Sequence, residues 1–385
     1  MKQILVLLLF IFLLQNSIAQ SANTTAKYGT VTIKNADISS AEMKAITHQL
    51  DSFYQKRIAA GFSGQVLIGY KGNVIYERYF GYADKESERL IDANSPSQLA
   101  STSKPITAIA IAILKDRGLL NFDDFVQKYI PAFPYTGITI RHLLTHRSGL
   151  PEYFGMAMSK PLPQGDSLMS NDSLVQLLID KKPKLVNPPN TKFRYRNTNY
   201  ALLSYIISVV SKMSYAEFVQ KNIFDVLEMK DSYVLDNTCA HKANCCKSYK
   251  RNWLQQKDTQ LDGITGDKGC YSTVQDLYKL DQALYQHTLI TPTTLEEMYL
   301  SYSFERKGYQ NYGLGWRMFN YPQQKIIFHN GYWQGNNNCF YRFINDNFTI
   351  IILGNKLNKY IYAHPQVIYK IITNNQLQVE EEVVE

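Results

Sequence analysis

The stretch LASTSKPITA, residues 99–108, places a serine three residues before a lysine, at the start of an apolar run that continues to Leu114. Residues three apart share a face of a helix. A helix beginning near Ser101 would therefore bring the Lys104 ammonium within one turn of the Ser101 hydroxyl. Pro105 suits a helix start, because the first N–H groups of a helix lack intrahelical partners. A serine hydroxyl is a weak nucleophile, and an adjacent amine can take its proton or orient a base that does.

Strand-like patterns lie on both sides of this stretch, and helical patterns fill the middle of the chain. Strands are predicted at 65–70, 74–80, 313–319, 325–329, 338–345 and 348–353. Helices are predicted at 41–60, 102–117, 123–129, 139–146, 172–181, 197–212, 214–227, 273–287, 291–300 and 364–374. This order predicts an α/β (α+β) fold, in which an antiparallel sheet of N- and C-terminal strands is flanked by helices and carries an inserted, mainly helical lobe at about 105–290. Ser101 would then lie at the join, where clefts form.

The ends of the chain differ in composition from its middle. Residues 1–19 read as a signal peptide, with Lys2, an apolar core and a small-x-small cleavage site before Gln20. We expect a loose arm at 20–37, one hydrolase domain at 38–376 and a disordered acidic tail at 377–385. The mature protein is therefore expected to be secreted or periplasmic.

Composition bounds the function. The chain has 385 residues, 45% of them hydrophobic, and a formal net charge of +8. Its basic residues are spread thinly, without a run of five, so nucleic-acid binding is not expected. Beyond the leader, no stretch reaches the roughly 18 apolar residues that a membrane span needs. The sequence does not indicate an oligomeric state.

Five cysteines leave their chemistry open. An exported chain permits disulfides, and the odd count leaves at least one thiol free or paired between chains. The spacing Cys239-x-His241-x3-Cys245-Cys246 invites a zinc interpretation, but adjacent cysteines do not match known zinc spacings. We expect a local disulfide, with free thiols and a metal as alternatives, and no metal or cofactor in the reaction. The five residues are Cys239, Cys245, Cys246, Cys270 and Cys339.

A tyrosine and an asparagine supply partners for the serine–lysine pair. The triplet Tyr195-Arg196-Asn197 precedes an apolar helix. Residues two apart in an extended segment point the same way. The Tyr195 phenol beside a lysine ammonium can act as a base. The Asn197 amide can hydrogen-bond both a substrate carbonyl and Lys104.

A second polar segment, His329-Asn330-Gly331-Tyr332, lies at the end of an apolar strand. Gly331 would let a substrate backbone approach closely. His329 would form a polar wall able to carry positive charge, and we expect it to decide which acyl group is accepted. The N–H groups of Ser101 and Tyr332 would form an oxyanion hole.

Taken in order, these motifs resemble the superfamily of serine β-lactamases and penicillin-binding proteins. The resemblance is to the branch of class C β-lactamases, D-aminopeptidases, DD-carboxypeptidases and related esterases, and it covers roughly residues 60–360. His329-Asn330-Gly331 stands where many members have Lys-Thr-Gly. Accessory segments agree: residues 138–151 resemble the "LLTHTSGLP" loop, 269–277 the "GGxxST" turn and 312–316 the "YGLGW" strand.

The resemblance implies a role for each matching residue. Ser101 is the nucleophile that becomes acylated, and Lys104 and Tyr195 handle its proton. Asn197 positions the substrate, and His329 and Gly331 line the opposite wall. It also implies that His142 and His146, although catalytic by residue type, are structural.

Three positions depart from the family pattern. Class C β-lactamases generally have lysine in the place of His329, so the departure favours an esterase or peptidase over an efficient β-lactamase. Pro188-Pro189-Asn190 stands where Pro-Gly is usual, and Cys270 and Tyr271 replace smaller residues beside the cleft. These departures concern the shape of the pocket.

A second nucleophile motif competes with Ser101. Gly165-Asp166-Ser167-Leu168 matches the signature of GDSL lipases letter for letter. In that family the motif follows an N-terminal strand, and an Asp-x-x-His lies near the C-terminus. Here it lies in a proline-rich segment in mid-chain, and no Asp-x-x-His follows near the end, so we interpret the match as chance.

The sequence thus predicts an exported serine hydrolase that forms an acyl-enzyme at Ser101. Its substrate would be a small ester or a peptide, including D-amino-acid peptides derived from the cell wall. The alternative of a different class is a penicillin-binding sensor that acylates without turnover. A GDSL-type lipase acting through Ser167 is the third hypothesis.

Overall fold

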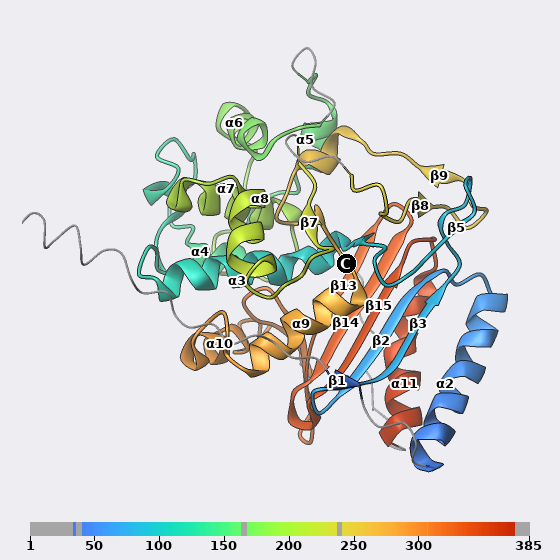
Figure 1. Cartoon of the computed structure of the whole chain (residues 1–385). Helices are drawn as coiled ribbons and strands as arrows, with labels where there is room; N and C mark the ends of the chain where they lie inside the picture. Colours follow the sequence, from blue (N-terminus) through green and yellow to red (C-terminus); the bar gives the residue numbers. More distant parts are fainter. Residues whose placement is uncertain (1–33, 36–40, 163–167, 237–240, 306, 374–385) are drawn as a thin grey trace, which may run out of the picture. The chain divides into compact units, whose positions relative to one another are not determined.

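The computed structural model describes residues 34–35, 41–162, 168–236, 241–305 and 307–373 (Figure 1). The predicted leader, most of the predicted arm and the acidic tail lie outside these ranges. So do Cys239 and the first three residues of the GDSL motif. No single helix of the described part is long and apolar enough to cross a membrane. One pair of consecutive helices is long and apolar enough when taken together, but the two are bent by 77° relative to each other. These helices are Asn197–Ser211 and Tyr215–Phe224.

The main sheet brings both ends of the domain together. Its strand order is β1-β3-β2-β15-β14-β13-β12-β11. The pairing of β2 with β15 joins Gly64↔Gly354 through Tyr70↔Phe348. All pairs are antiparallel except β1 with β3. The bounds are β1 Lys34–Asn35, β2 Gly64–Tyr70, β3 Asn73–Phe80, β11 Gln310–Tyr312, β12 Arg317–Asn320, β13 Lys325–Trp333, β14 Asn336–Phe343 and β15 Phe348–Gly354.

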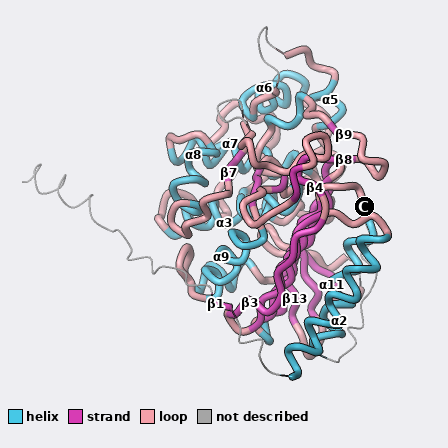
Figure 2. The backbone as a smooth tube through the Cα atoms, turned by 45° about the vertical axis from the view of Figure 1, so that its right-hand side comes forward, coloured by secondary structure: helices cyan, strands magenta, loops and turns pink. Residues whose placement is uncertain are grey.

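Each face of this sheet has its own apolar core. One face packs against the two terminal helices, α2 (Ala41–Ala59) and α11 (His364–Thr373), which lie side by side in both views (Figures 1 and 2). The other face packs against α9 (Val274–Tyr285) and the helical lobe. A buried ion pair between Arg342 of β14 and Asp281 of α9 fastens that face. The fold class predicted from the sequence is confirmed.

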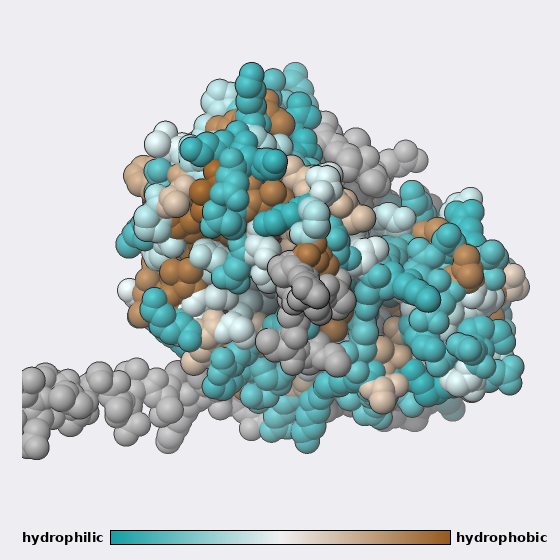
Figure 3. Space-filling model, turned by 90° about the horizontal axis from the view of Figure 1, so that it is seen from above, coloured by the Kyte–Doolittle hydropathy of each residue, from teal (hydrophilic) through white to brown (hydrophobic). Residues whose placement is uncertain are grey.

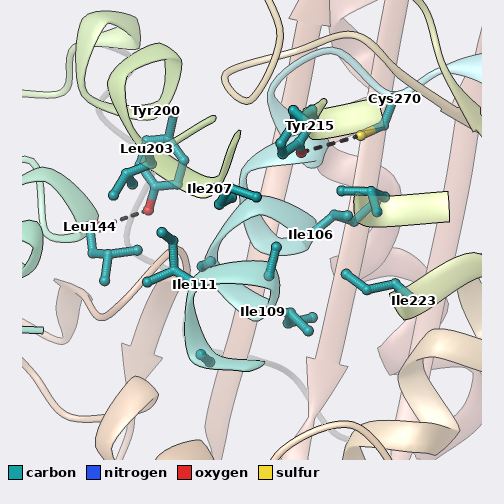
Figure 4. Packing of buried hydrophobic residues seen from close by; sticks show 14 of the residues in the cluster. Ile106, Ile109, Ile111, Leu144, Tyr200, Leu203, Ile207, Tyr215, Ile223 and Cys270 are labelled. Carbon is teal, nitrogen blue, oxygen red and sulfur yellow. Dashed lines mark hydrogen bonds between the residues drawn. The ribbon is translucent and has the colours of Figure 1, made fainter. Parts of the chain in front are cut away.

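The helical lobe is built around α3 (Ser103–Asp116), which is buried along most of its length. Its isoleucines point into a cluster formed with α7 (Asn197–Ser211) and the segment after it (Figure 4). The Tyr200 hydroxyl donates to the carbonyl of Leu144 at 2.7 Å. The lobe's other helices are α4 Ile140–Leu144, α5 Phe154–Met158, α6 Asn171–Lys181, α8 Tyr215–Val219 and α10 Pro292–Met298, with a π-helical turn at Gln220–Phe224 and 3-10 turns at Val126–Lys128 and Gln260–Gly263.

Three small sheets accompany the main sheet: β6-β10-β7, β4-β5 and β8-β9. The strands are β4 Tyr82–Asp84, β5 Arg89–Leu90, β6 Ser97–Gln98, β7 Tyr233–Val234, β8 Ser248–Tyr249, β9 Gln255–Gln256 and β10 Cys270–Ser272. Figure 3 shows the surface from above, with hydrophobic residues scattered among hydrophilic ones. More of the hydrophobic residues lie on the left side, which is the side of the helical lobe in Figure 1. Scattered apolar side chains of this kind are normal on globular proteins.

Several predicted elements differ from those observed. Residues 313–316, expected within a strand, form a turn between β11 and β12, where Gly315 has a φ of +87° and the Gly313 N–H bonds the Trp316 carbonyl. The helix expected at 123–129 is only a 3-10 turn. Residues 82–98, expected as a connection, contain three short strands. These strands are only two or three residues long, too short for a periodic pattern to reveal.

Candidate active site

Lys104 is the centre of the site. Its side chain is fully buried. The ammonium nitrogen lies 3.0 Å from Ser101 Oγ, 2.8 Å from Asn197 Oδ1 and 2.9 Å from the backbone carbonyl of Asp267. The two oxygens of Asn197 and Asp267 can only accept, so two N–H groups of Lys104 point at them. The third position of the nitrogen then faces Ser101, as a donor when the lysine is charged and as an acceptor when it is neutral.

Ser101 is held at the start of α3 by a short 3-10 turn, Ala100–Thr102. The preceding residue, Ala100, is buried with a φ of +49°, a region that residues other than glycine rarely occupy. The Leu99 N–H donates to the Cys270 carbonyl at 2.8 Å, and the Cys270 N–H donates to Ser103 Oγ at 3.2 Å. Strand β10 thus fixes the turn that carries the candidate nucleophile. Ser101 itself is partly exposed.

The Tyr195 ring lies beside two cations. Lys104 Nζ is 4.9 Å from its centroid and the Arg317 guanidinium carbon is 5.0 Å from it. The ring also packs against His146, with centroids 4.3 Å apart. Among the described residues, no hydrogen bond joins the Tyr195 hydroxyl to Ser101 or Lys104. Such bonds often form only when substrate is bound.

Asn197 is the first residue of α7, and Glu152 holds it. Both the backbone N–H and the side-chain Nδ2 of Asn197 donate to Glu152 Oε2, each at 3.0 Å. Glu152 is a functional residue that the sequence patterns did not reveal. The signal that could have found it is a carboxylate directly after the loop at residues 138–151.

A second buried polar group lies behind Lys104. The Asp267 carboxylate accepts from the Tyr153 hydroxyl at 3.0 Å and lies 3.7 Å from Lys268 Nζ. Lys268 in turn donates to the Tyr153 hydroxyl at 2.8 Å. Burial lowers the pKa of Lys268 despite the adjacent Asp267. This cluster could not be recognised from the sequence, because Tyr153 lies 114 residues before Asp267 in the chain.

His329 is placed near Tyr195 but is fully buried, so it is not an open wall. His146 Nδ1 accepts from the Arg196 N–H and the Asn199 amide, which leaves its Nε2–H to donate to the Tyr312 hydroxyl at 3.2 Å. The Tyr312 hydroxyl then donates to His329 Nε2 at 3.3 Å. The His329 Nδ1–H donates to the Asn330 carbonyl at 2.7 Å.

In this chain of bonds, His146 is neutral because its Nδ1 accepts, and His329 is neutral because its Nε2 accepts from Tyr312. Burial, reinforced by Arg317 and Lys104, lowers the pKa of His329 well below its ordinary value. Burial and Lys104 lower the pKa of His146 in the same way. The expectation that His329 could carry positive charge is therefore wrong. His146, expected to be structural, contacts the Tyr195 ring directly and fixes the backbone of the next residue.

Gly331 and Tyr332 lie where β13 passes the nucleophile. A Cβ on Gly331 would meet the Leu99 carbonyl at 2.4 Å and Thr102 Oγ1 at 2.9 Å. The absence of a side chain at Gly331 thus lets the strand pack against the turn that carries the nucleophile. From the sequence, we expected it to let a substrate backbone approach. Tyr332 is 52% exposed, and Lys359 Nζ lies 5.6 Å from the centroid of its ring. Pairing of β12 with β13 ends at Arg317↔Phe328, whereas β13 stays paired with β14 to Trp333↔Asn336.

The other predicted features fall outside this cluster. His142 completes a capping box with Thr139 at the start of α4. In the described part of the chain, Cys245, Cys246 and Cys270 form no disulfide, and Cys270 is buried. His241 bonds Asp258 at 2.7 Å and also the Cys245 thiol, and these two partners raise the pKa of His241 to about 10. In the described ranges, no group of three or more His, Cys, Asp or Glu residues could hold a metal ion.

The neutral His329 predicts a pH dependence of stability. An unfolded histidine binds a proton below about pH 6.5, whereas the buried His329 does not, so lowering the pH favours unfolding. Each such histidine removes up to about 1.4 kcal/mol per pH unit below that point. Urea unfolding at pH 7.5 and 5.5 should show a smaller loss of stability in His329→Gln than in the wild type. An equal loss in both proteins would contradict the neutral assignment.

Known proteins resemble this chain in both sequence and fold. A family model described as Beta-lactamase matches residues 50–365. Penicillin-binding protein 4* of Bacillus subtilis (strain 168) is 34% identical over 310 residues, which cover 77% of this chain and 68% of that protein. The penicillin binding protein from Bacillus halodurans has a TM-score of 0.72 at 23% identity, covering 85% of this chain and 97% of its own. D-amino acid amidase from Ochrobactrum anthropi SV3 has a TM-score of 0.71 at 20% identity, covering 86% and 99%.

The sheet, its helical insert and the family match together define a serine hydrolase. The chain belongs to the β-lactamase family. The resemblance stated from the sequence motifs is therefore confirmed.

Proposed function

We propose that the protein is an exported hydrolase that cleaves esters or peptides through an acyl-enzyme at Ser101. The observation that carries the proposal is the contact between Ser101 Oγ and Lys104 Nζ at 3.0 Å, with the lysine fully buried and its remaining donors fixed by Asn197 and Asp267. A buried ammonium that serves only packing would be costly, because removing a charge from water costs several kcal/mol.

The proposed reaction has two steps. In the first, Ser101 Oγ bonds the substrate carbonyl carbon while its proton passes to the Lys104–Tyr195 pair. The bond to the leaving group then breaks, and the pair returns the proton to that group. In the second step, water attacks the acyl carbon and gives its proton to the same pair, which returns one to Ser101 Oγ as the acid is released. Backbone N–H groups of Ser101 and Tyr332 would stabilise the oxyanion in both steps.

The substrate class is argued from the site and the relatives. The neutral His329 offers no positive charge at the position where many family members have lysine. This supports esters and peptides over efficient turnover of β-lactam antibiotics. Relatives named as penicillin-binding proteins and a D-amino acid amidase of the same fold support peptides with D-amino acids, of cell-wall origin.

The test is to locate the acyl group. The protein is incubated with penicillin and, separately, with a fluorophosphonate, and intact mass and peptide mapping follow the adduct. We expect one adduct per chain, on the peptide that contains Ser101, and none in Ser101→Ala. An adduct that survives in Ser101→Ala and is lost in Ser167→Ala would overturn the proposal in favour of a GDSL-type lipase. A penicillin adduct that forms but persists for hours, in a protein that hydrolyses no ester or D-amino acid amide, would overturn the hydrolase in favour of a binding protein.

A further inference from the structure

Glu152 gives its whole carboxylate to three N–H groups. Oε1 accepts from the Tyr153 N–H at 3.0 Å, and Oε2 accepts from the backbone N–H and the Nδ2 of Asn197, both at 3.0 Å. All three partners can only donate. An ionised carboxylate can only accept, and so it matches this set without an unpaired donor.

The contact from Nδ2 decides which way the Asn197 amide points. With Nδ2 on the carboxylate, Oδ1 faces Lys104 Nζ at 2.8 Å. A flipped amide would set Nδ2 against the ammonium and Oδ1 against the carboxylate, and both contacts would repel. One N–H of Nδ2 remains for a substrate carbonyl, because an amide has two.

The contact from the backbone fixes the start of the helix. Asn197 is the first residue of α7, and the N-cap residue, Arg196, provides no side-chain bond. The first N–H groups of a helix are unpaired and attract negative charge. Glu152 therefore holds Asn197 by both its backbone and its side chain.

We propose that Glu152 is a positioning residue for acyl transfer, which aligns Asn197 and, through it, Lys104 against Ser101. The inference rests on the proposed function. Glu152 touches neither Ser101 nor Lys104 by a hydrogen bond in the described part of the chain, so its effect passes through Asn197.

The charges around Glu152 give this role a pH signature. Burial, with a contribution from the Asp267 carboxylate, raises the pKa of Glu152, while Lys104 and the N–H bonds oppose the rise. Lys268 also faces Glu152 from the Asp267 side. Protonation of Glu152 would weaken its bonds to Asn197. The acylation rate should therefore fall as the pH is lowered through the raised pKa, at a higher pH than for an ordinary glutamate.

The experiment measures acylation rates of the full chain by a chromogenic ester between pH 4.5 and 8.5. In Glu152→Gln, an amide replaces an acceptor-only group, so either the Tyr153 N–H or both Asn197 donors lose their acceptor. We expect the acylation rate at pH 7.5 to be lowered by about tenfold to a hundredfold, as for a displaced catalytic group. We also expect this variant to lose the acidic limb of the pH profile, which is the fall in rate caused by protonation of Glu152. Glu152→Asp keeps the charge and should retain part of the rate and the limb. The matched control is Glu217→Gln on α8, which breaks a surface ion pair between Glu217 and Lys221.

Two results would overturn the inference. One is a wild-type rate and pH profile in Glu152→Gln. The other is a lowered rate with an unchanged acidic limb, which would show a structural role alone. If Glu152→Gln does not fold, Glu152→Asp decides, because its shorter carboxylate should lower the rate and move the pH of the acidic limb. A wild-type rate and pH profile in Glu152→Asp would then overturn the inference. A failure of the proposed function is distinct, because it would appear as an adduct in Ser101→Ala whatever Glu152 does.

Discussion

Replacing Lys104 with methionine is expected to slow acylation of Ser101 by a factor on the order of 10³ to 10⁶, the range seen when one member of a catalytic unit is removed. Methionine has nearly the same length and no charge, so it fills the space and removes only the ammonium. Ser101 then has no neighbour that accepts or orients its proton at 3.0 Å. The measurement is the rate of p-nitrophenyl ester hydrolysis together with the rate of penicillin adduct formation.

This variant should still fold. Methionine fills a similar volume and removes the cost of burying a charge, although Asn197 Oδ1 and the Asp267 carbonyl each lose a donor. Lys115→Met is the matched control, on the same helix but paired with Asp116 and Glu297 away from Ser101. A folded Lys104→Met that keeps more than a tenth of the wild-type rate would contradict the assignment.

The second large effect is expected from Gly331→Ala. The added methyl group would lie 2.4 Å from the Leu99 carbonyl, a backbone atom that cannot turn aside. Either β13 or the turn that carries Ser101 must move. Overpacking of this kind costs about 1–3 kcal/mol of stability, and a displacement of 1 Å at a reacting group costs roughly a hundredfold in rate. Thermal unfolding and ester hydrolysis measure the two effects.

The matched control is Gly155→Ala in α5, where a Cβ would meet no atom within 4 Å. That variant should keep the wild-type rate, and its stability should not fall. If Gly331→Ala has the rate of Gly155→Ala, close packing of β13 against the nucleophile turn is not required for catalysis.

The sequence predicted the fold class because its periodic patterns are long. The apolar strands at 65–70 and 348–353 and the helix after Ser101 were recognisable from local pattern alone. The turn at 313–316 was not, because its reversal depends on a glycine with positive φ and on contacts with α10 and α3. The strands of two or three residues exist only through their partners in space.

Some residues of the candidate site could likewise be predicted from the sequence, and others could not. Ser101, Lys104 and Asn197 could be predicted, because their spacing and family motifs are visible in one dimension, and the structure brings them within hydrogen-bonding distance. The state of His329 could not be predicted, because it depends on burial and on Tyr312 and His146. Glu152 was missed because its importance lies in three N–H partners rather than in a motif.

The pairing of β2 with β15 has a consequence for how the protein matures. These strands are separated by almost the whole domain, and closing so long a loop costs entropy before any contact repays it. Ser101 belongs to the first part of the chain, whereas Gly331, against which its turn packs, belongs to the last. A partly folded chain would therefore carry the nucleophile without its surroundings. During refolding, the reactivity of Ser101 should therefore appear late and in a single phase, at the same time as β2 pairs with β15.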